Sequence, residues 1–186
     1  MAAGPKPVRR VVTGNDAQGR SRVVWDSAAP NTRPSPGHPG AGMAELWAWH
    51  TCPAALSGER DDGALPFHPH APEQGGFLRL VQSAARAKNY DAAKDASAEP
   101  LRETRERPGG TAWDRGAQNA FSSPVHKTQT VDYGIVMQGE RVLILDEGER
   151  VMRQGDVVVQ LGNWHGWSNP RSDSLMAFIM LGATFY

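Results

Sequence analysis

The sequence predicts an all-β protein built as an antiparallel β-barrel or jelly roll, and three observations carry that prediction. Short segments rich in β-branched and apolar residues recur along the chain, with Gly, Pro, Asn or Asp clusters between them. In the last third, these segments follow one another through turns of two or three residues. No helical periodicity separates them there, and barrels or jelly rolls suit such hairpins because they leave few exposed sheet edges.

The first half of the chain contains four expected strands separated by long connections. The strands cover residues 8–13, 21–25, 45–50 and 76–81. Pro- and Gly-rich stretches at 29–42 and 65–76 are expected to be loops, because proline cannot donate to a sheet ladder. The second stretch carries the pair His68 and His70, each next to a proline, which we interpret as part of a solvated connection rather than as a ligand pair.

Residues 85–118 are polar and charged and interrupt the series of strands. An alanine-rich piece, AARAKNYDAAKDASAE, favours a short helix that would end before Pro100. The following piece, RETRERPGGTAWDRGAQ, is expected to be a mobile excursion. Its charged run 102–107 is interpreted as a solvated face or a disordered arm without a function.

The last sixty or so residues are denser in strand signals than the rest of the chain. Strands are expected at 131–137, 140–145, 149–153, 157–160 and 175–185. The segment 157–160, with three consecutive valines, is expected to be a core strand, and 175–185 to be the closing strand. We therefore place the barrel core at 121–186. Residues 1–120 form an N-terminal arm of strands and loops that packs on the barrel or on a second subunit, within one domain.

Composition restricts the partners and the compartment. Twenty Lys and Arg balance twenty Asp and Glu, so no net field attracts nucleic acid or an anionic membrane, and neither is expected as a partner. No apolar run has the length of a membrane span or follows the N-terminal basic residues as in a signal peptide. The single cysteine, Cys52, is expected to be an inert, buried or half-buried thiol, and its lack of a disulfide partner favours a cytoplasmic protein.

Three side chains have the chemistry of a metal site. His126 and Asp132 are six residues apart and share one face of an extended segment, and His165 is flanked by Trp164 and Trp167. Imidazole nitrogen and carboxylate oxygen are ligands that Mn, Fe, Ni, Cu and Zn share. Three such groups with open positions describe a catalytic metal site. The alternatives are a hydrogen-bonded polar cluster and a metal-free pair in which a histidine beside a carboxylate acts as a general base.

Two sequence runs resemble the two motifs of the cupin family. The run HKTQTVDYGIVMQG at 126–139 resembles the first motif, and GDVVVQLGNWHGWSN at 155–169 resembles the second. By this resemblance His126 matches the first metal ligand, Asp132 the acidic ligand and His165 the last ligand, whereas Thr128 stands where a second histidine is usual. The resemblance implies a cupin barrel, a divalent transition metal (Fe, Mn, Ni or Zn) and a homodimer.

The overall pattern is similar to small single-domain cupins of the cupin 2 conserved barrel type, which include cupin-domain oxidoreductases. This similarity implies a metal-dependent oxidoreductase or dioxygenase that acts on a small organic substrate of aromatic or polyketide-like character. The alternatives are a metal-dependent lyase, either a decarboxylase or a dehydratase, and a non-catalytic cupin that binds a small molecule. We expect the substrate pocket to be lined by Thr128, Trp164, Trp167 and Phe178, although aromatic residues at strand spacing are also ordinary core residues.

Overall fold

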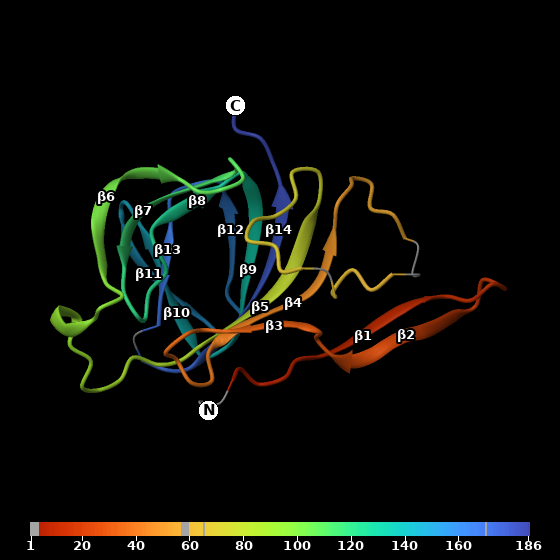
Figure 1. Ribbon diagram of the computed structural model, residues 1–186, viewed down its shortest axis with the longest axis horizontal. Coiled ribbons are helices and arrows are strands. Elements are labelled where there is room, and N and C mark those ends of the chain that lie inside the picture. The colour runs from red at the N-terminus through yellow and green to blue at the C-terminus, as the bar shows by residue number, and fades with distance from the viewer. Residues whose placement is uncertain (1–3, 57–59, 65, 170) are drawn as a thin grey trace.

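The computed structural model describes residues 4–56, 60–64, 66–169 and 171–186, and it confirms the all-β prediction (Figure 1). Among these residues the only helix is the short 3-10 helix η1 (Ala92–Lys94). The strands are β1 (Arg9–Asn15), β2 (Ser21–Ala28), β3 (Asn31–Pro34), β4 (Gly42–Trp49), β5 (Gly76–Ser83), β6 (Glu99–Glu106), β7 (Ala112–Gln118), β8 (His126–Thr128), β9 (Thr130–Gln138), β10 (Glu140–Leu145), β11 (Gly148–Arg153), β12 (Val157–Leu161), β13 (Gly166–Ser168) and β14 (Ser174–Gly182).

The strands form two walls that enclose the core. One wall is a six-stranded sheet in the order β12-β9-β14-β5-β4-β3. The other consists of two three-stranded sheets, β11-β10-β13 and β6-β7-β8, which an antiparallel bridge between residues 126 and 165 connects. Figure 1 shows these walls side by side, with the hairpin β1-β2 projecting away from them. The main core cluster joins both walls through Val136, Leu143, Trp167 and Met176.

Strands that precede residue 121 are continuous with the barrel sheet. β5 pairs with β14 along its whole length, and β4 pairs with β5, so three of the six strands of the larger sheet come from the first half of the chain. A second core cluster of Ala48, Ala71 and Phe77 lies in this part. Of the tight hairpins predicted in the last third, β10 and β11 form one, because they pair antiparallel with two residues between them. The expected hairpin at Gly139 is not formed, since that turn connects β9 in the six-stranded wall to β10 in the other wall.

The prediction of a mobile excursion after Pro100 was wrong. β6 and β7 pair antiparallel there, and β7 pairs in turn with β8. The expected helix shortens to the three residues of η1. β6 was not predicted because it is rich in charged residues, most of which are exposed. In β7 the alternate residues Ala112, Asp114 and Gly116 are buried. Pairing with a neighbouring strand here overrides weak local strand preference.

The expectation of a core strand at 157–160 also needs correction. β12 is the edge strand of the six-stranded sheet and pairs only with β9 among the described residues. Val157 and Val159 are 56% and 52% exposed, whereas Gln160 is 2% exposed. Successive side chains of a strand point to opposite faces, so this register turns Val157 and Val159 outward. Val158 and Gln160 point inward, and Val158 packs against the main core cluster.

The turn between β9 and β10 depends on Gly139. Its φ is +72°, and a Cβ atom at this position would lie 2.2 Å from the backbone oxygen of Asp173. We expect Gly139→Ala to lower the free energy of unfolding by more than about 1 kcal/mol in urea titrations, because the strain cannot be relieved by moving a side chain. Gly155→Ala is the control, since Gly155 has a φ of +91° but no atom within 4 Å of the added Cβ. Equal losses in the two variants would contradict the steric explanation.

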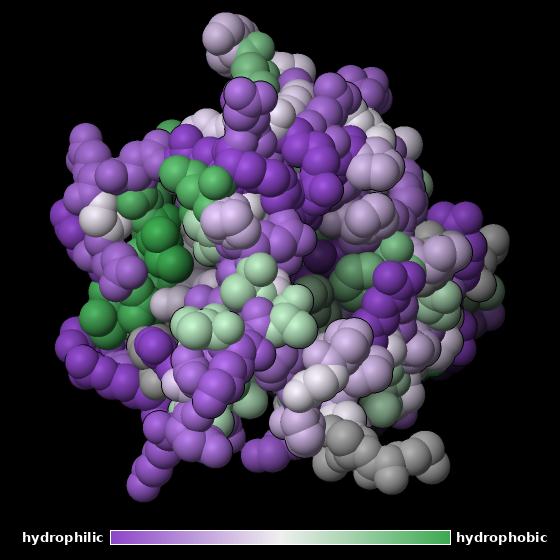
Figure 2. Space-filling view, turned by 60° about the vertical axis from the view of Figure 1, so that its left-hand side comes forward, coloured by the Kyte–Doolittle hydropathy of each residue, from purple (hydrophilic) through white to green (hydrophobic). Residues whose placement is uncertain are grey.

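The surface is largely hydrophilic on the face that Figure 2 shows, with a few hydrophobic patches. Cys52 is exposed, which corrects the expectation of a buried or half-buried thiol. None of the helices in the described part of the chain is long and apolar enough to cross a membrane.

Candidate functional site

The fold brings His126 and His165 together. The backbone N–H of each residue donates to the carbonyl oxygen of the other, at 2.8 and 2.9 Å. The ring centroids lie 4.4 Å apart with an angle of 53° between the ring planes. His165 is buried and His126 is half-buried. Two histidines 39 positions apart in the sequence therefore form one imidazole pair, and both are among the three candidate metal ligands named from the sequence.

Backbone carbonyls fix the protonation of both rings. Nδ1 of His126 lies 2.7 Å from the carbonyl oxygen of Pro124, and Nδ1 of His165 lies 3.0 Å from that of Asn163. A carbonyl oxygen only accepts, so each Nδ1 carries the proton and each Nε2 keeps a lone pair. Burial, and secondarily the neighbouring His165, lower the pKa of His126 to about 3, and burial lowers the pKa of His165 as well. Both imidazoles are therefore neutral near pH 7.

Asp132 lies on the opposite wall beside a residue that the sequence analysis missed. Gln160 is its direct antiparallel partner on β12, and the two residues are 3% and 2% exposed. Oδ1 of Asp132 and both side-chain polar atoms of Gln160 are buried without a hydrogen-bond partner. Burial raises the pKa of Asp132 to about 6, against an opposing hydrogen bond from Thr130. The signal that could have revealed Gln160 is one polar residue within the apolar run VVVQL.

The four predicted pocket residues have different surroundings. Thr128 is buried, and its hydroxyl lies 2.5 Å from that of Thr130. Trp167 is buried in the main core and contacts Phe178 edge to face, with the ring centroids 5.8 Å apart. Trp164 instead lies under the charged groups of Arg115 and Lys127 and lines a separate cavity of about 480 Å³. The structure thus brings Trp167 and Phe178 together but places Trp164 in other surroundings.

The donor atoms suit a metal ion in kind. Two neutral imidazoles with free Nε2 atoms, each oriented by a backbone carbonyl, have the form that metal-binding histidines adopt. The unpartnered Oδ1 of Asp132 is a further donor. Their spacing does not complete a site, since among the described residues no three His, Cys, Asp or Glu side chains are grouped closely enough to hold a metal. The imidazole pair is present, and the three-ligand set stays a prediction.

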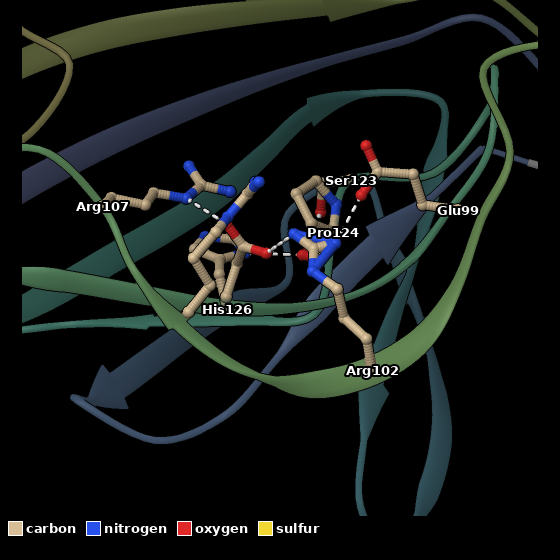
Figure 3. A network of polar contacts seen from close by, with 8 residues as sticks. Glu99, Arg102, Arg107, Ser123, Pro124 and His126 are labelled. Atoms are coloured by element: carbon tan, nitrogen blue, oxygen red, sulfur yellow. Dashed lines mark hydrogen bonds and ion pairs between the residues drawn. The ribbon is translucent and has the colours of Figure 1, made fainter.

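An arginine cluster next to His126 is a second feature that the sequence analysis missed. Asp114 on β7 is the direct partner of His126 on β8 and is 1% exposed. Its carboxylate contacts Arg102, Arg107 at 3.0 Å and Arg105 at 3.4 Å. Figure 3 shows Arg102 and Arg107 converging beside His126. Burial alone would raise the pKa of Asp114, but hydrogen bonding and charge from the arginines outweigh it and lower that pKa. The charged run interpreted as having no function thus supplies this cluster.

The interpretation of His68 as part of a solvated connection was wrong. Its Nδ1 lies 2.6 Å from the carboxylate of Glu45, which is 1% exposed and also contacts Arg79 at 2.7 Å. Burial lowers the pKa of Arg79. The proline-rich loop thus contributes to a buried ion-pair network in the six-stranded wall.

Comparison with known proteins places the chain in a family. It is 31% identical over 184 residues to phomopsin biosynthesis cluster protein C' of Diaporthe leptostromiformis, covering 94% of this chain and 78% of that protein. It is 27% identical over 180 residues to cupin-domain-containing oxidoreductase fogC of Aspergillus ruber, covering 96% and 72%. A 48-residue segment, 25% of each chain, is 58% identical to cupin-domain-containing oxidoreductase virC of Hypocrea virens. The chain belongs to the cupin superfamily.

This cupin was also compared with protein-family models and with solved structures. A scan against models of known protein families found no match. Among solved structures, the fold resembles a cupin 2 conserved barrel protein from Salinispora arenicola with a TM-score of 0.40, at 14% identity and 76% coverage of each chain. It resembles the Cnp3 cupin domain of Schizosaccharomyces pombe with a TM-score of 0.41, at 11% identity, covering 93% of this chain and 86% of that one.

Proposed function

We propose that this cupin is an enzyme of the oxidoreductase type, acting on a small organic substrate of aromatic or polyketide-like character. The observation that carries the proposal is the pair of neutral imidazoles, His126 and His165, held 4.4 Å apart with their Nε2 atoms unprotonated. The relatives named as cupin-domain-containing oxidoreductases and as a biosynthesis cluster protein support it. Cytoplasmic location and a homodimer remain part of the proposal.

The imidazole pair would hold a divalent first-row metal through the two Nε2 atoms, and substrate or water would take the remaining positions. When bound, such an ion supplies Lewis-acid or redox chemistry. The chain's own residues provide the rest. The carbonyls of Pro124 and Asn163 keep both Nδ1 protons in place, and Gln160 offers an unpartnered amide donor and acceptor on the inner face.

A lyase acting at the same site is the second candidate, and the environment of Asp132 favours it. Burial raises the pKa of this carboxyl to about 6, close to neutrality, where a group can both take up and release a proton. A decarboxylase or dehydratase needs such a group. Consumption of oxygen during turnover separates the two candidates, because only the oxidoreductase that uses oxygen would show it.

Metal content tests the proposal without a known substrate. Protein purified without added metal should contain close to one equivalent of a transition metal, or unfold at a higher temperature when Mn, Fe, Ni or Zn is added. His126→Ala and His165→Ala should each lose this metal, whereas His50→Ala, which changes an exposed histidine, should keep it. Less than about a tenth of an equivalent together with no thermal shift would refute the metal-dependent form of the proposal.

Activity gives the second test. Against a panel of aromatic and polyketide-like compounds, removal of either imidazole should lower turnover by about 10²-fold or more, which is the usual contribution of a positioned acid, base or ligand. His50→Ala should leave it unchanged. If His126→Ala and His165→Ala turned over as fast as the unaltered protein, the site would be assigned wrongly, whichever reaction is found.

A further inference from the structure

We propose that the arginine cluster around Asp114, formed by Arg102, Arg105 and Arg107, binds the carboxylate group of an organic acid substrate. This inference rests on the proposed function, since it assigns a substrate class to the same site. Guanidinium groups present a planar fork of donors that matches a carboxylate, which makes arginine the usual residue for recognising one.

The register of β7 and β8 places the cluster on the same side of the sheet as His126. Asp114 is paired with His126, and Ala112 with Thr128. Paired residues of antiparallel strands point to the same face, and both Ala112 and Thr128 are buried, at 1% and 5% exposure. Asp114 therefore points to the inner face next to His126, and Figure 3 shows Arg102 and Arg107 beside that histidine.

The cluster has hydrogen-bond donors to spare. Arg102 is engaged twice, by Glu99 and by Asp114. Arg107 contacts Asp114 through Nε, which leaves its two terminal nitrogens for another acceptor. Arg105 reaches Asp114 only at 3.4 Å, and its side chain is 65% exposed. The one buried carboxylate of Asp114 thus contacts three guanidinium groups but leaves some of their N–H donors without a partner among the contacts described.

A cavity of about 450 Å³ lies at these groups, and Arg105, Arg107 and Asp114 form part of its lining. That volume suits a small organic molecule. Glu99 and Glu106 also line it, so the lining carries three carboxylates and two arginines. Arg102, which contacts Glu99 and Asp114 from outside the lining, brings this group of side chains to a net charge of zero. A neutral but directional set of donors favours a singly charged carboxylate over a polyanion such as a phosphate ester, for which a net positive charge would be needed.

Benzoate and its uncharged analogue benzamide are suitable probes. In calorimetric or NMR titrations, the protein should bind benzoate at least tenfold more tightly than benzamide. Arg105→Gln should weaken benzoate binding about tenfold while leaving the closer contacts of Arg102 and Arg107 with Asp114 in place, so this variant should fold normally. Arg105→Gln combined with Arg107→Gln should weaken it further. Arg150→Gln, at an exposed position of β11, is the matched control and should bind as the unaltered protein does.

Three results would overturn the inference. They are equal affinities for benzoate and benzamide, benzoate binding that is unchanged in the double arginine variant, and no benzoate binding at millimolar concentration by the unaltered protein. A failure of the proposed function is distinguishable, because it would appear as unchanged turnover in His126→Ala. That variant keeps the arginines and should still bind benzoate.

Discussion

Glu45→Ala is expected to lower the free energy of unfolding by about 3–5 kcal/mol, the usual cost of removing one partner from a buried ion pair. Glu45 is 1% exposed and accepts hydrogen bonds from Arg79 at 2.7 Å and from the His68 backbone at 3.3 Å. The variant would leave the guanidinium of Arg79 in the six-stranded wall without its carboxylate. Urea unfolding monitored by tryptophan fluorescence measures the loss.

The reason for so large an effect is that Arg79 cannot move to water. Its guanidinium lies 4.1 Å from the ring centroid of Phe67 and 3.9 Å from that of Phe77, and Arg79 is 8% exposed. Its Nε already has no hydrogen-bond partner. Stacking on aromatic rings compensates a buried cation only in part, so the charge of Glu45 carries most of the remaining compensation.

Two further variants separate this explanation from simple loss of volume. Glu45→Leu combined with Arg79→Met removes both charges and should be clearly more stable than Glu45→Ala alone. Asp26→Ala breaks the exposed pair with Arg9, whose side chains are 45% and 73% exposed, and should cost less than about 1 kcal/mol. If the double variant were no more stable than Glu45→Ala, uncompensated charge would not be the cause.

Asp132→Asn is expected to stabilise the metal-free protein at pH 7 by about 3 kcal/mol. The pKa of Asp132 is raised from 3.8 to about 6 by burial, so its ionised form is disfavoured in the folded state. Between these two values the folded chain holds the proton that the unfolded chain has released. The contribution of Asp132 to stability is therefore lost as the pH rises through this range, and asparagine, which does not ionise, avoids the loss.

The histidines contribute a pH dependence of the opposite sign to that of Asp132, so the stability of Asp132→Asn must be compared with that of the unaltered protein at each pH. The pKa of His126 is lowered to about 3, which means that its contribution is present above the unfolded value of 6.5 and is lost as the pH falls. Subtracting the two unfolding curves at pH 4, 5, 6 and 7, in the presence of a chelator, cancels that contribution. The difference should be small at pH 4 and largest at pH 7. A difference that does not vary with pH would contradict the raised pKa.

Local signals sufficed to predict most of the fold. The hairpin of β10 and β11 depends on residues that are neighbours in the sequence, and the structure confirms it. The errors concern side chains whose placement depends on distant strands. β6 is highly charged, and its strand structure depends on pairing with β7. Val157 and Val159 of β12 face outward because of the register in which β12 pairs with β9, which no local pattern reveals.

The candidate site divides in the same way. Alternation along extended segments, together with the resemblance to the cupin motifs, identified His126 and His165, and the structure brings them together. Gln160 and Asp114 were missed because their positions depend on the neighbouring strands. Gln160 is paired with Asp132 and Asp114 with His126. A polar residue in an isolated strand could equally face solvent, so only the register shows that these two point inward.

The reciprocal backbone hydrogen bonds between residues 126 and 165 bear on how readily this protein can acquire new chemistry. The main chain, and not the imidazoles, sets the spacing of the two positions, so exchanging either side chain for another donor type leaves the scaffold in place. Evolution or protein design can therefore exchange the reacting side chains one at a time while the backbone that positions them stays folded.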